Sequence, residues 1–254
     1  MYKLIITDFD GSLVGKELII SKENLKAIEE IRKIGMDITI ATGRRWQSIE
    51  PFVKELKIKI PVILYNGAGI YDHLNNRWLE RKFLDIDTFR EILDFLRPFY
   101  SKISFGIYWK DNLWEKNKAW NIIDSIKDEL IKLFLEAEKD TLENVEVLLN
   151  TYFKNKIEIV PSAENYLEIL PKGCSKGKAM LKLLNYLGIS PTEVIAIGDY
   201  DNDIDMLKKA GLGVTLLNSS PRIKEEADYI TSSGPERALA EVVENFVLKN
   251  FCER

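Results

Sequence analysis

The sequence contains few of the residues on which many metal centres and nucleophilic hydrolases depend. Its 254 residues include only two cysteines and one histidine. Cys174 and Cys252 are far apart and have no paired spacing, so neither a disulfide framework nor a thiolate metal site is expected. His73 lies in a predicted hairpin loop, and one histidine leaves little material for multi-histidine metal sites or Ser-His-Asp catalysis. We interpret His73 as an ordinary loop residue.

Long apolar runs and a surplus of positive charge are also missing. No segment approaches the ~20 apolar residues of a membrane-spanning helix. The chain enters a predicted strand almost at once, so we expect no signal peptide, no membrane contact and a cytoplasmic location. The formal net charge is −4, whereas nucleic-acid-binding proteins carry a basic surface, so nucleic acid is not an expected partner. The sequence gives no signal for an oligomeric state.

The segments that are present alternate between short apolar runs and amphipathic stretches. Strands are predicted over 3–7, 37–41, 61–65 and 193–198, with helices over 21–34, 46–56, 175–187 and 236–248. This alternation implies right-handed crossovers and a parallel sheet. Between 83 and 168 the pattern changes to hairpins, alternating strands and helices, one of them over 119–129. We predict an α/β, Rossmann-like core formed by 1–82 and 169–254, with an inserted α+β domain over 83–168.

The first apolar run stops at two carboxylates, Asp8 and Asp10. Strand side chains alternate between faces, so both would start on the same side. At ~4 Å two such charges repel by roughly 4 kcal/mol at an effective dielectric constant of about 20. A shared proton or a bound cation would relieve this repulsion, and oxygen ligands favour a hard ion such as Mg²⁺. A simple Asp-Gly turn explains the pair equally well, so this stretch alone does not decide between a cation site and a turn.

Other predicted strands also end at polar residues. The carboxyl ends of parallel strands meet at the crevice where ligands bind, and the start of a helix favours an anion. Three acidic groups for a cation, together with Lys, Thr and Asn for an anion, describe a phosphate–Mg²⁺ site. The groups at the strand ends are Asp8/Asp10, Thr42/Gly43, Asn66/Gly67 and Asp199/Asn202/Asp203, and the helix begins at Ser175-Lys176-Gly177-Lys178.

These residues stand in the order and approximate spacing of the four motifs of the haloacid-dehalogenase (HAD) superfamily, which the chain resembles. The matching segments are Asp8-Phe-Asp10-Gly-Ser12, Thr42-Gly43, Lys176 and Gly198-Asp199-Tyr-Asp-Asn202-Asp203. Ile63–Ala68 and Tyr166–Lys172 are similar to the Cof-type, or subfamily IIB, phosphatases. The resemblance implies a HAD fold in which the inserted domain is a cap that excludes water and supplies substrate contacts.

The resemblance also implies a role for each matching position. Asp8 would be the nucleophile that forms an aspartyl-phosphate, and Asp10 would be the general acid and base. The side chains of Asp8 and Asp199, with the main-chain carbonyl of Asp10, would hold Mg²⁺. Asp203 would orient Lys176 or a metal-bound water. The groups that would bind the phosphoryl oxygens are Thr42, the Gly43 N–H, Lys176 and Asn202.

Several of these positions also allow a purely structural interpretation. In this interpretation Asp203 only interacts favourably with the dipole at the start of a helix, and Lys176 is a solvated surface lysine. Arg44 and Arg45 are interpreted as a solvent-facing charge pair rather than substrate ligands. Asn66 either reaches the substrate or caps a turn.

Two departures from the family and one aromatic cluster complete the set of expectations. Ser12 replaces the usual threonine but keeps the hydroxyl, and Cys174, which replaces a common valine, is interpreted as a packing residue. Aromatic side chains of the inserted domain are expected to fill the core of a small sheet rather than to stack on a ligand. They are Phe105, Tyr108, Trp109, Trp114 and Trp120.

The leading functional interpretation is a Mg²⁺-dependent phosphatase of small phosphorylated metabolites, with sugar phosphates as one candidate class. A phosphotransferase or phosphomutase that uses the same aspartyl-phosphate is the second hypothesis. A non-catalytic metabolite-binding protein on the same fold is the third, and the complete Asp8, Asp10, Lys176 and Asp199 set argues against it. The sequence does not identify the leaving group.

Overall fold

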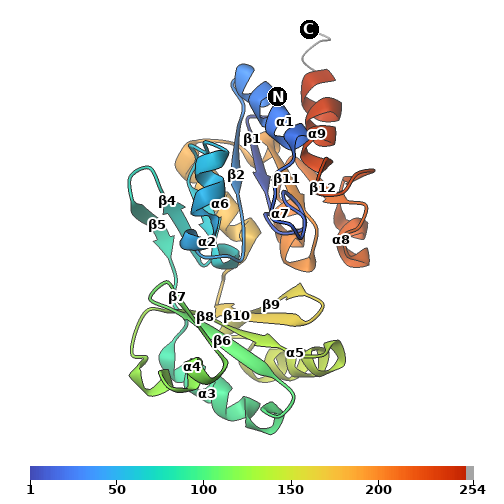
Figure 1. Cartoon of the computed structure of the whole chain (residues 1–254). Helices are drawn as coiled ribbons and strands as arrows, with labels where there is room; N and C mark the ends of the chain where they lie inside the picture. The colour runs from blue at the N-terminus through green and yellow to red at the C-terminus, as the bar shows by residue number, and fades with distance from the viewer. Residues whose placement is uncertain (250–254) are drawn as a thin grey trace. The chain divides into compact units, whose positions relative to one another are not determined.

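The structure is a computed structural model that describes residues 1–249, without the side chains of Lys116 and Asn117. It divides into two compact units (Figure 1). The first comprises Met1–Leu79 and the chain from Ser175 onward, and the second comprises Glu80–Cys174. The second unit therefore runs from 80 to 174 rather than over the expected 83–168. The extension follows from the strand Tyr166–Pro171, which is paired in the sheet of the second unit.

The first unit is built on a parallel five-stranded sheet in the order β13-β12-β11-β1-β2. Strand β1 lies inside the sheet between β11 and β2, and Thr7 at its end lies opposite Ile197 and Ile40. All five strands therefore deliver their following residues to the same edge of the sheet. The strands are β1 (Leu4–Thr7), β2 (Asp37–Ile40), β11 (Val194–Gly198), β12 (Leu212–Leu216) and β13 (Tyr229–Thr231).

Helices cover both faces of this sheet. Leu4 and Ile6 of β1 share a buried cluster with Met180 and Leu183 of α6, which α7 and α8 extend. On the other face α1 and α9 lie side by side (Figure 1), and the Asn24 amide oxygen accepts a hydrogen bond from the N–H of Ala240 at 3.2 Å. The helices are α1 (Lys22–Lys33), α2 (Trp46–Glu55), α6 (Lys176–Leu187), α7 (Ile204–Leu207), α8 (Pro221–Glu226) and α9 (Ala238–Val242).

The third predicted strand belongs mainly to another sheet. β3 (Val62–Leu64) pairs antiparallel with β4 (Gly69–Asp72), and β5 (Arg77–Arg81) completes a three-stranded sheet. Its link to the parallel sheet is an isolated bridge between Ala41 and Ile63. The turn after β3 includes Gly67 at φ +92°, where a Cβ atom would lie 2.2 Å from the carbonyl oxygen of Ser175. Glycine is required there because the start of α6 approaches this closely.

The second unit is an antiparallel sheet in the order β7-β6-β8-β10-β9. One face packs against α3 and α5 through residues such as Phe89, Leu149, Ile107 and Leu133. The elements are α3 (Ile86–Leu96), β6 (Ser104–Trp109), β7 (Asn112–Glu115), α4 (Lys116–Trp120), β8 (Leu130–Glu136), α5 (Lys139–Phe153), β9 (Ile157–Ala163) and β10 (Tyr166–Pro171). The predicted fold class, a parallel α/β core with an inserted α+β domain, is confirmed.

Two predicted helices differ in extent. In place of a helix over 119–129, α4 ends at Trp120 and a 3₁₀ turn covers Ile123–Ser125, because Ile126 is buried in an extended conformation. The closing helix begins at Ala238 rather than Glu236 and continues as a π-helix over Val243–Leu248. Within the described chain, no helix has the length and apolar character needed to cross a membrane.

Candidate active site

Three carboxylates converge at the carboxyl edge of the parallel sheet. Asp8 follows β1, Asp199 follows β11, and Asp203 ends the 3₁₀ turn Asp201–Asp203. One oxygen of each lies within 4.8 Å of the others. Gly11, at φ +80°, makes room for this group, since a Cβ atom there would lie 2.2 Å from Asp199 Oδ2. The predicted acidic cluster therefore exists, although Asp203 rather than the Asp10 side chain is its third carboxylate.

Lys176, the first residue of α6, is fully buried between two of these carboxylates. Its Nζ lies 2.5 Å from Asp8 Oδ1 and 2.7 Å from Asp203 Oδ1. Burial alone would lower the pKa of Lys176, but Asp203 and Asp8 outweigh it and raise that pKa above its usual value. Lys176 is therefore a fixed cation of the site, and its interpretation as a solvated surface lysine is wrong.

Asp203 is held by more than Lys176. Its Oδ2 accepts hydrogen bonds from the main-chain N–H groups of Asp199 at 3.2 Å and Tyr200 at 3.3 Å. The hydroxyl of Ser12 donates to Asp199 Oδ1 at 3.0 Å, so the hydroxyl at this position has a defined partner. Asp203 thus fixes both Lys176 and the loop after β11. A residue that interacted only with the helix dipole would not need these contacts.

The carboxylates of Asp8 and Asp199 resist ionisation in the protein without a bound cation. Burial raises the pKa of Asp8 well above its usual value, and Asp203 and Asp199 add to the effect while Lys176 opposes it. Burial, followed by the charge of Asp203, raises the pKa of Asp199 to about 6. One lysine does not neutralise three carboxylates. Because Asp203 already accepts three hydrogen bonds, the oxygen donors of Asp8 and Asp199 fit a hard divalent cation such as Mg²⁺.

Polar residues from two neighbouring loops lie beside this group. Thr42 follows β2, and its Oγ1 accepts the N–H of Arg44 at 3.1 Å. The Nδ2 atom of Asn202 donates to Asn66 Oδ1 at 3.1 Å, and Asn66 is buried with φ +52°. Among the described residues, Asn202 Oδ1 is buried without a hydrogen-bond partner. The Oδ1 atom can therefore accept a hydrogen bond from a ligand, whereas an anion could be bound only by the second N–H of Nδ2, because the first donates to Asn66.

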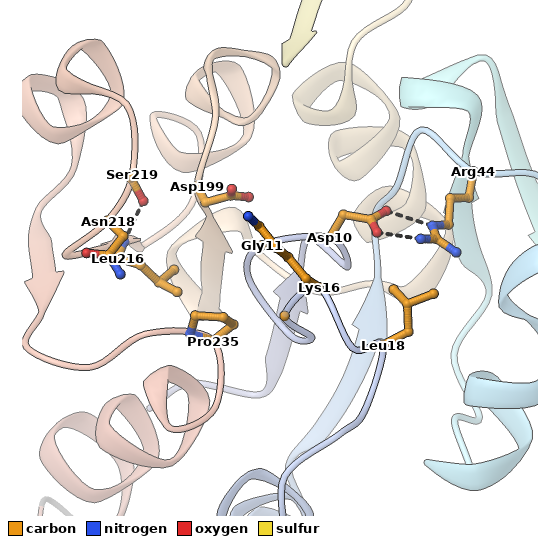
Figure 2. A pocket seen from close by; sticks show the side chains of 11 residues that line it. Asp10, Gly11, Lys16, Leu18, Arg44, Asp199, Leu216, Asn218, Ser219 and Pro235 are labelled. Atoms are coloured by element: carbon orange, nitrogen blue, oxygen red, sulfur yellow. Dashed lines mark hydrogen bonds and ion pairs between the residues drawn. The ribbon is translucent and has the colours of Figure 1, made fainter. Parts of the chain in front are cut away.

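The Asp10 carboxylate points toward Arg44 and away from Asp199 (Figure 2). The Nε and Nη2 atoms of Arg44 donate to the two Asp10 carboxylate oxygens at 2.7 and 2.6 Å. The guanidinium also lies 5.0 Å from the ring centroid of Phe9. Arg44, whose side chain is 28% exposed, is therefore not a free charge at the surface, since it has a defined partner in Asp10. The available signal was its place directly after Thr42-Gly43, in the loop that follows the strand adjacent to β1, after which Asp10 comes.

A cavity of about 570 Å³ opens beside Asp10 and Asp199 within the first unit (Figure 2). Its size falls within the usual range for small-ligand sites. Residues outside the four motifs contribute to its walls, and sequence patterns had not singled them out. They include Lys16, Leu18, Asn218, Ser219 and Pro235.

The remaining expectations concern residues away from the carboxylates. His73 lies in the turn between β4 and β5, where its ring stacks on Trp46 with centroids 5.5 Å apart. Cys174 is buried, as its interpretation as a packing residue predicts, whereas Cys252 lies outside the described residues. Of the aromatic side chains in the second unit, Phe105 is buried in the core and Trp120 is 44% exposed. The core-filling interpretation therefore holds for only part of that set.

Comparison with known proteins identifies the family. A model of haloacid dehalogenase-like hydrolases matches residues 5–243. The chain belongs to this family. The expected enzyme class is confirmed as well, since the chain is 35% identical to a Bacillus subtilis 5-amino-6-(5-phospho-D-ribitylamino)uracil phosphatase, over 97% of this chain and 96% of that one. A second B. subtilis phosphatase with the same named substrate is 29% identical, with coverage of 96% and 98%.

Solved structures of similar proteins support the same assignment. A Thermotoga maritima protein superimposes with a TM-score of 0.79 at 26% identity, covering 97% of this chain and 98% of its own. A haloacid dehalogenase-like hydrolase from Bacteroides thetaiotaomicron gives a TM-score of 0.78 at 27% identity, with coverage of 96% and 99%. The likeness therefore extends over both units of this HAD phosphatase.

Proposed function

We propose that the protein is a Mg²⁺-dependent phosphatase that transfers the phosphoryl group of a small metabolite to Asp8 and then to water. The observation that carries this proposal is the buried Lys176, which contacts both Asp8 and Asp203 beside Asp199. A fixed cation next to a carboxylate nucleophile is suited to a reaction that depends on positioning and on charge neutralisation.

In the first step an Asp8 oxygen attacks phosphorus, the bond to the leaving oxygen breaks, and Asp10 gives that oxygen a proton. In the second step Asp10 takes a proton from water as the water oxygen attacks phosphorus and the bond to Asp8 breaks. Asp10 thereby returns to its starting state, and phosphate leaves. The phosphoryl oxygens are bound by Thr42, the Gly43 N–H, Lys176 and Asn202.

Mg²⁺, when bound by Asp8, Asp199 and the main-chain carbonyl of Asp10, supplies positive charge that lets the phosphoryl group approach the carboxylates. The chain's own residues prepare for this. Ser12 holds Asp199, and Asp203 holds Lys176 and the loop after β11. Arg44 orients the Asp10 side chain through two hydrogen bonds, one to each carboxylate oxygen.

We propose 5-amino-6-(5-phospho-D-ribitylamino)uracil as the substrate. Two relatives carry this substrate in their names, and one of them is 35% identical along almost the whole chain. The compound is a phosphate ester of a sugar alcohol attached to a pyrimidine ring, which lies close to the sugar-phosphate class expected from the sequence. The cavity of about 570 Å³ beside Asp10 is large enough for a leaving group of this kind.

A substrate panel tests both parts of the proposal. Phosphate release with Mg²⁺ is measured for the pyrimidine compound, ribitol 5-phosphate and several hexose phosphates, with Asp8→Asn and EDTA as blanks. We expect the highest kcat/KM for the pyrimidine compound and no release in either blank. A higher kcat/KM for another compound would replace the proposed substrate. Isomerised product without free phosphate would instead indicate a mutase.

A further inference from the structure

The loop after the Asp8–Asp10 motif brings a lysine to the cavity beside the proposed acid. Lys16 lines the cavity together with Asp10 and Asp199, and Figure 2 shows its ammonium group extending toward the Asp199 side. Lys176 and Arg44 are both paired with carboxylates, whereas no ion pair of Lys16 is found within residues 1–249. Lys16 therefore brings to the cavity an ammonium group that can donate to a ligand.

The wall formed by the loop after β12 offers an amide and apolar surface. Asn218 is exposed in the loop after β12, and the neighbouring Ser219 hydroxyl fixes this loop by accepting the N–H of Leu216 at 3.0 Å. Leu216 and Pro235 line the cavity on the Asn218 side, and Leu18 lines it on the Arg44 side (Figure 2). Besides the charged residues Asp10, Arg44 and Asp199, the cavity therefore offers Lys16 and Asn218 together with apolar walls.

The backbone of Leu18 indicates that the surrounding structure determines the conformation of the loop that carries Lys16 and Leu18. Its φ is +51°, in the left-handed region that residues other than glycine seldom adopt, and its side chain is 38% exposed. Such a conformation persists only where the surrounding structure determines it, and these conformations concentrate at ligand sites. The loop holds Lys16 and Leu18 at the cavity in this way.

The position of Asp10 indicates which part of a substrate would enter. The acid must lie within hydrogen-bond reach of the leaving oxygen, so the group attached to that oxygen begins next to Asp10. Asp10 is itself a lining residue of the cavity. A leaving group larger than a few atoms can therefore extend from Asp10 toward Lys16 and Asn218.

We propose that this cavity binds the leaving group and that Lys16 and Asn218 recognise its pyrimidine ring. Lys16 donates to a ring carbonyl oxygen, Asn218 pairs with an adjacent carbonyl and N–H edge, and Leu18 and Pro235 contact the ring faces. The inference rests on the proposed function, because it assigns residues to the ring of the proposed substrate. It makes Lys16 a specificity residue rather than a catalytic one, since it lies outside the phosphoryl-binding set.

The test compares substrates that share the phosphate but differ in the leaving group. KM and kcat are measured for the pyrimidine compound, ribitol 5-phosphate and acetyl phosphate with Lys16→Met, Lys16→Arg, Asn218→Leu and the exposed control Lys26→Met. Loss of a hydrogen bond from a charged donor predicts that Lys16→Met raises KM for the pyrimidine compound about ten-fold. We expect kcat/KM for the other two substrates to stay unchanged. Lys16→Arg should raise KM for the pyrimidine compound less than Lys16→Met does. Lys26→Met should match the wild type.

Binding of the dephosphorylated product separates this inference from the proposed function. Calorimetry with 5-amino-6-(D-ribitylamino)uracil needs no turnover, so it reports on the ring site even if another phosphate ester is the substrate. We expect weaker product binding in Lys16→Met and Asn218→Leu than in Lys26→Met. Equal product binding in all variants, or an equal loss of kcat/KM for all three substrates, would overturn the inference. Absence of Asp8-dependent phosphate release would instead contradict the proposed function.

Discussion

The guanidinium of Arg44 and the carboxylate of Asp10 form a two-point hydrogen-bonded pair, with distances of 2.7 and 2.6 Å. The two residues follow neighbouring strands of the parallel sheet, so the register of β1 and β2 brings them together. The pair fixes the orientation of the group that we propose as general acid and base. Planar two-point contacts of this kind are specific to arginine.

Replacing Arg44 should therefore affect the chemical step. Arg44→Lys keeps the charge but loses the two-point contact, and Arg44→Met loses both, so we expect kcat to fall in that order, by about ten-fold or more for Arg44→Met. Arg90→Met, at an exposed helix position of the second unit, is the control. An unchanged kcat in Arg44→Met would mean that the pair has no role in turnover.

Lys176 should be indispensable for both stability and activity. Lys176→Met leaves Asp8 and Asp203 buried without their cation, and removing one partner of a buried charge pair costs about 3–5 kcal/mol. Urea unfolding should show this loss, together with the absence of phosphate release. Adding Asp203→Asn should recover part of the free energy of unfolding but none of the activity. Recovery of activity in the double variant would show that Lys176 serves only to balance charge.

Asp199 should destabilise the metal-free protein at neutral pH. Its folded pKa of about 6 lies above the usual 3.8, so the folded state disfavours the ionised form. The resulting decrease in the free energy of unfolding is absent near pH 4 and grows as the pH rises toward 6. Above pH 6 it reaches at most about 3 kcal/mol. In EDTA at pH 7.5, Asp199→Asn should therefore have a higher Tm than the wild type, with little difference at pH 4. Added Mg²⁺ should raise the Tm of the wild type alone.

Glu241 provides a contrasting case away from the candidate active site. Burial would raise the pKa of Glu241, but hydrogen bonds from Ser233, Ser232 and Tyr229 outweigh it and lower that pKa to about 2. A carboxylate whose pKa falls from 4.5 stabilises the fold above pH 4.5, and this contribution disappears as pH drops toward 2. Glu241→Gln should lower the free energy of unfolding by about 3 kcal/mol at pH 7, and by much less near pH 3. Its kcat at 25 °C should match the wild type, whereas a pH-independent loss of stability would contradict this explanation.

The sequence was sufficient to predict the parallel core, the inserted domain and the acidic cluster. Each depends on local signals, because apolar runs define strands and the residues after parallel strands share one edge. Lys176 could be placed near Asp8 only through the family resemblance, since 168 positions separate them. Its burial between two carboxylates depends on the tertiary structure, which no local sequence pattern predicts.

Features that depend on non-local pairing were beyond the sequence. A three-residue apolar run such as Val62–Leu64 fits a parallel or an antiparallel strand equally well, and its partner β4 decides between them. The helix predicted over 119–129 was lost because burial of Ile126 outweighed helix propensity. Arg44 was assigned to solvent because charged pairs usually are exposed, and only the register of two strands shows its partner.

Covalent trapping at Asp8 tests the central claim most directly. The wild-type enzyme is mixed with Mg²⁺ and the proposed substrate carrying radiolabelled phosphate, quenched in acid within milliseconds, and digested for peptide mapping. We predict label on the peptide that contains Asp8, formed before or with the first product release and absent from Asp8→Asn, which should also release no phosphate. Phosphate release by Asp8→Asn at the wild-type rate, without labelled protein, would contradict the account.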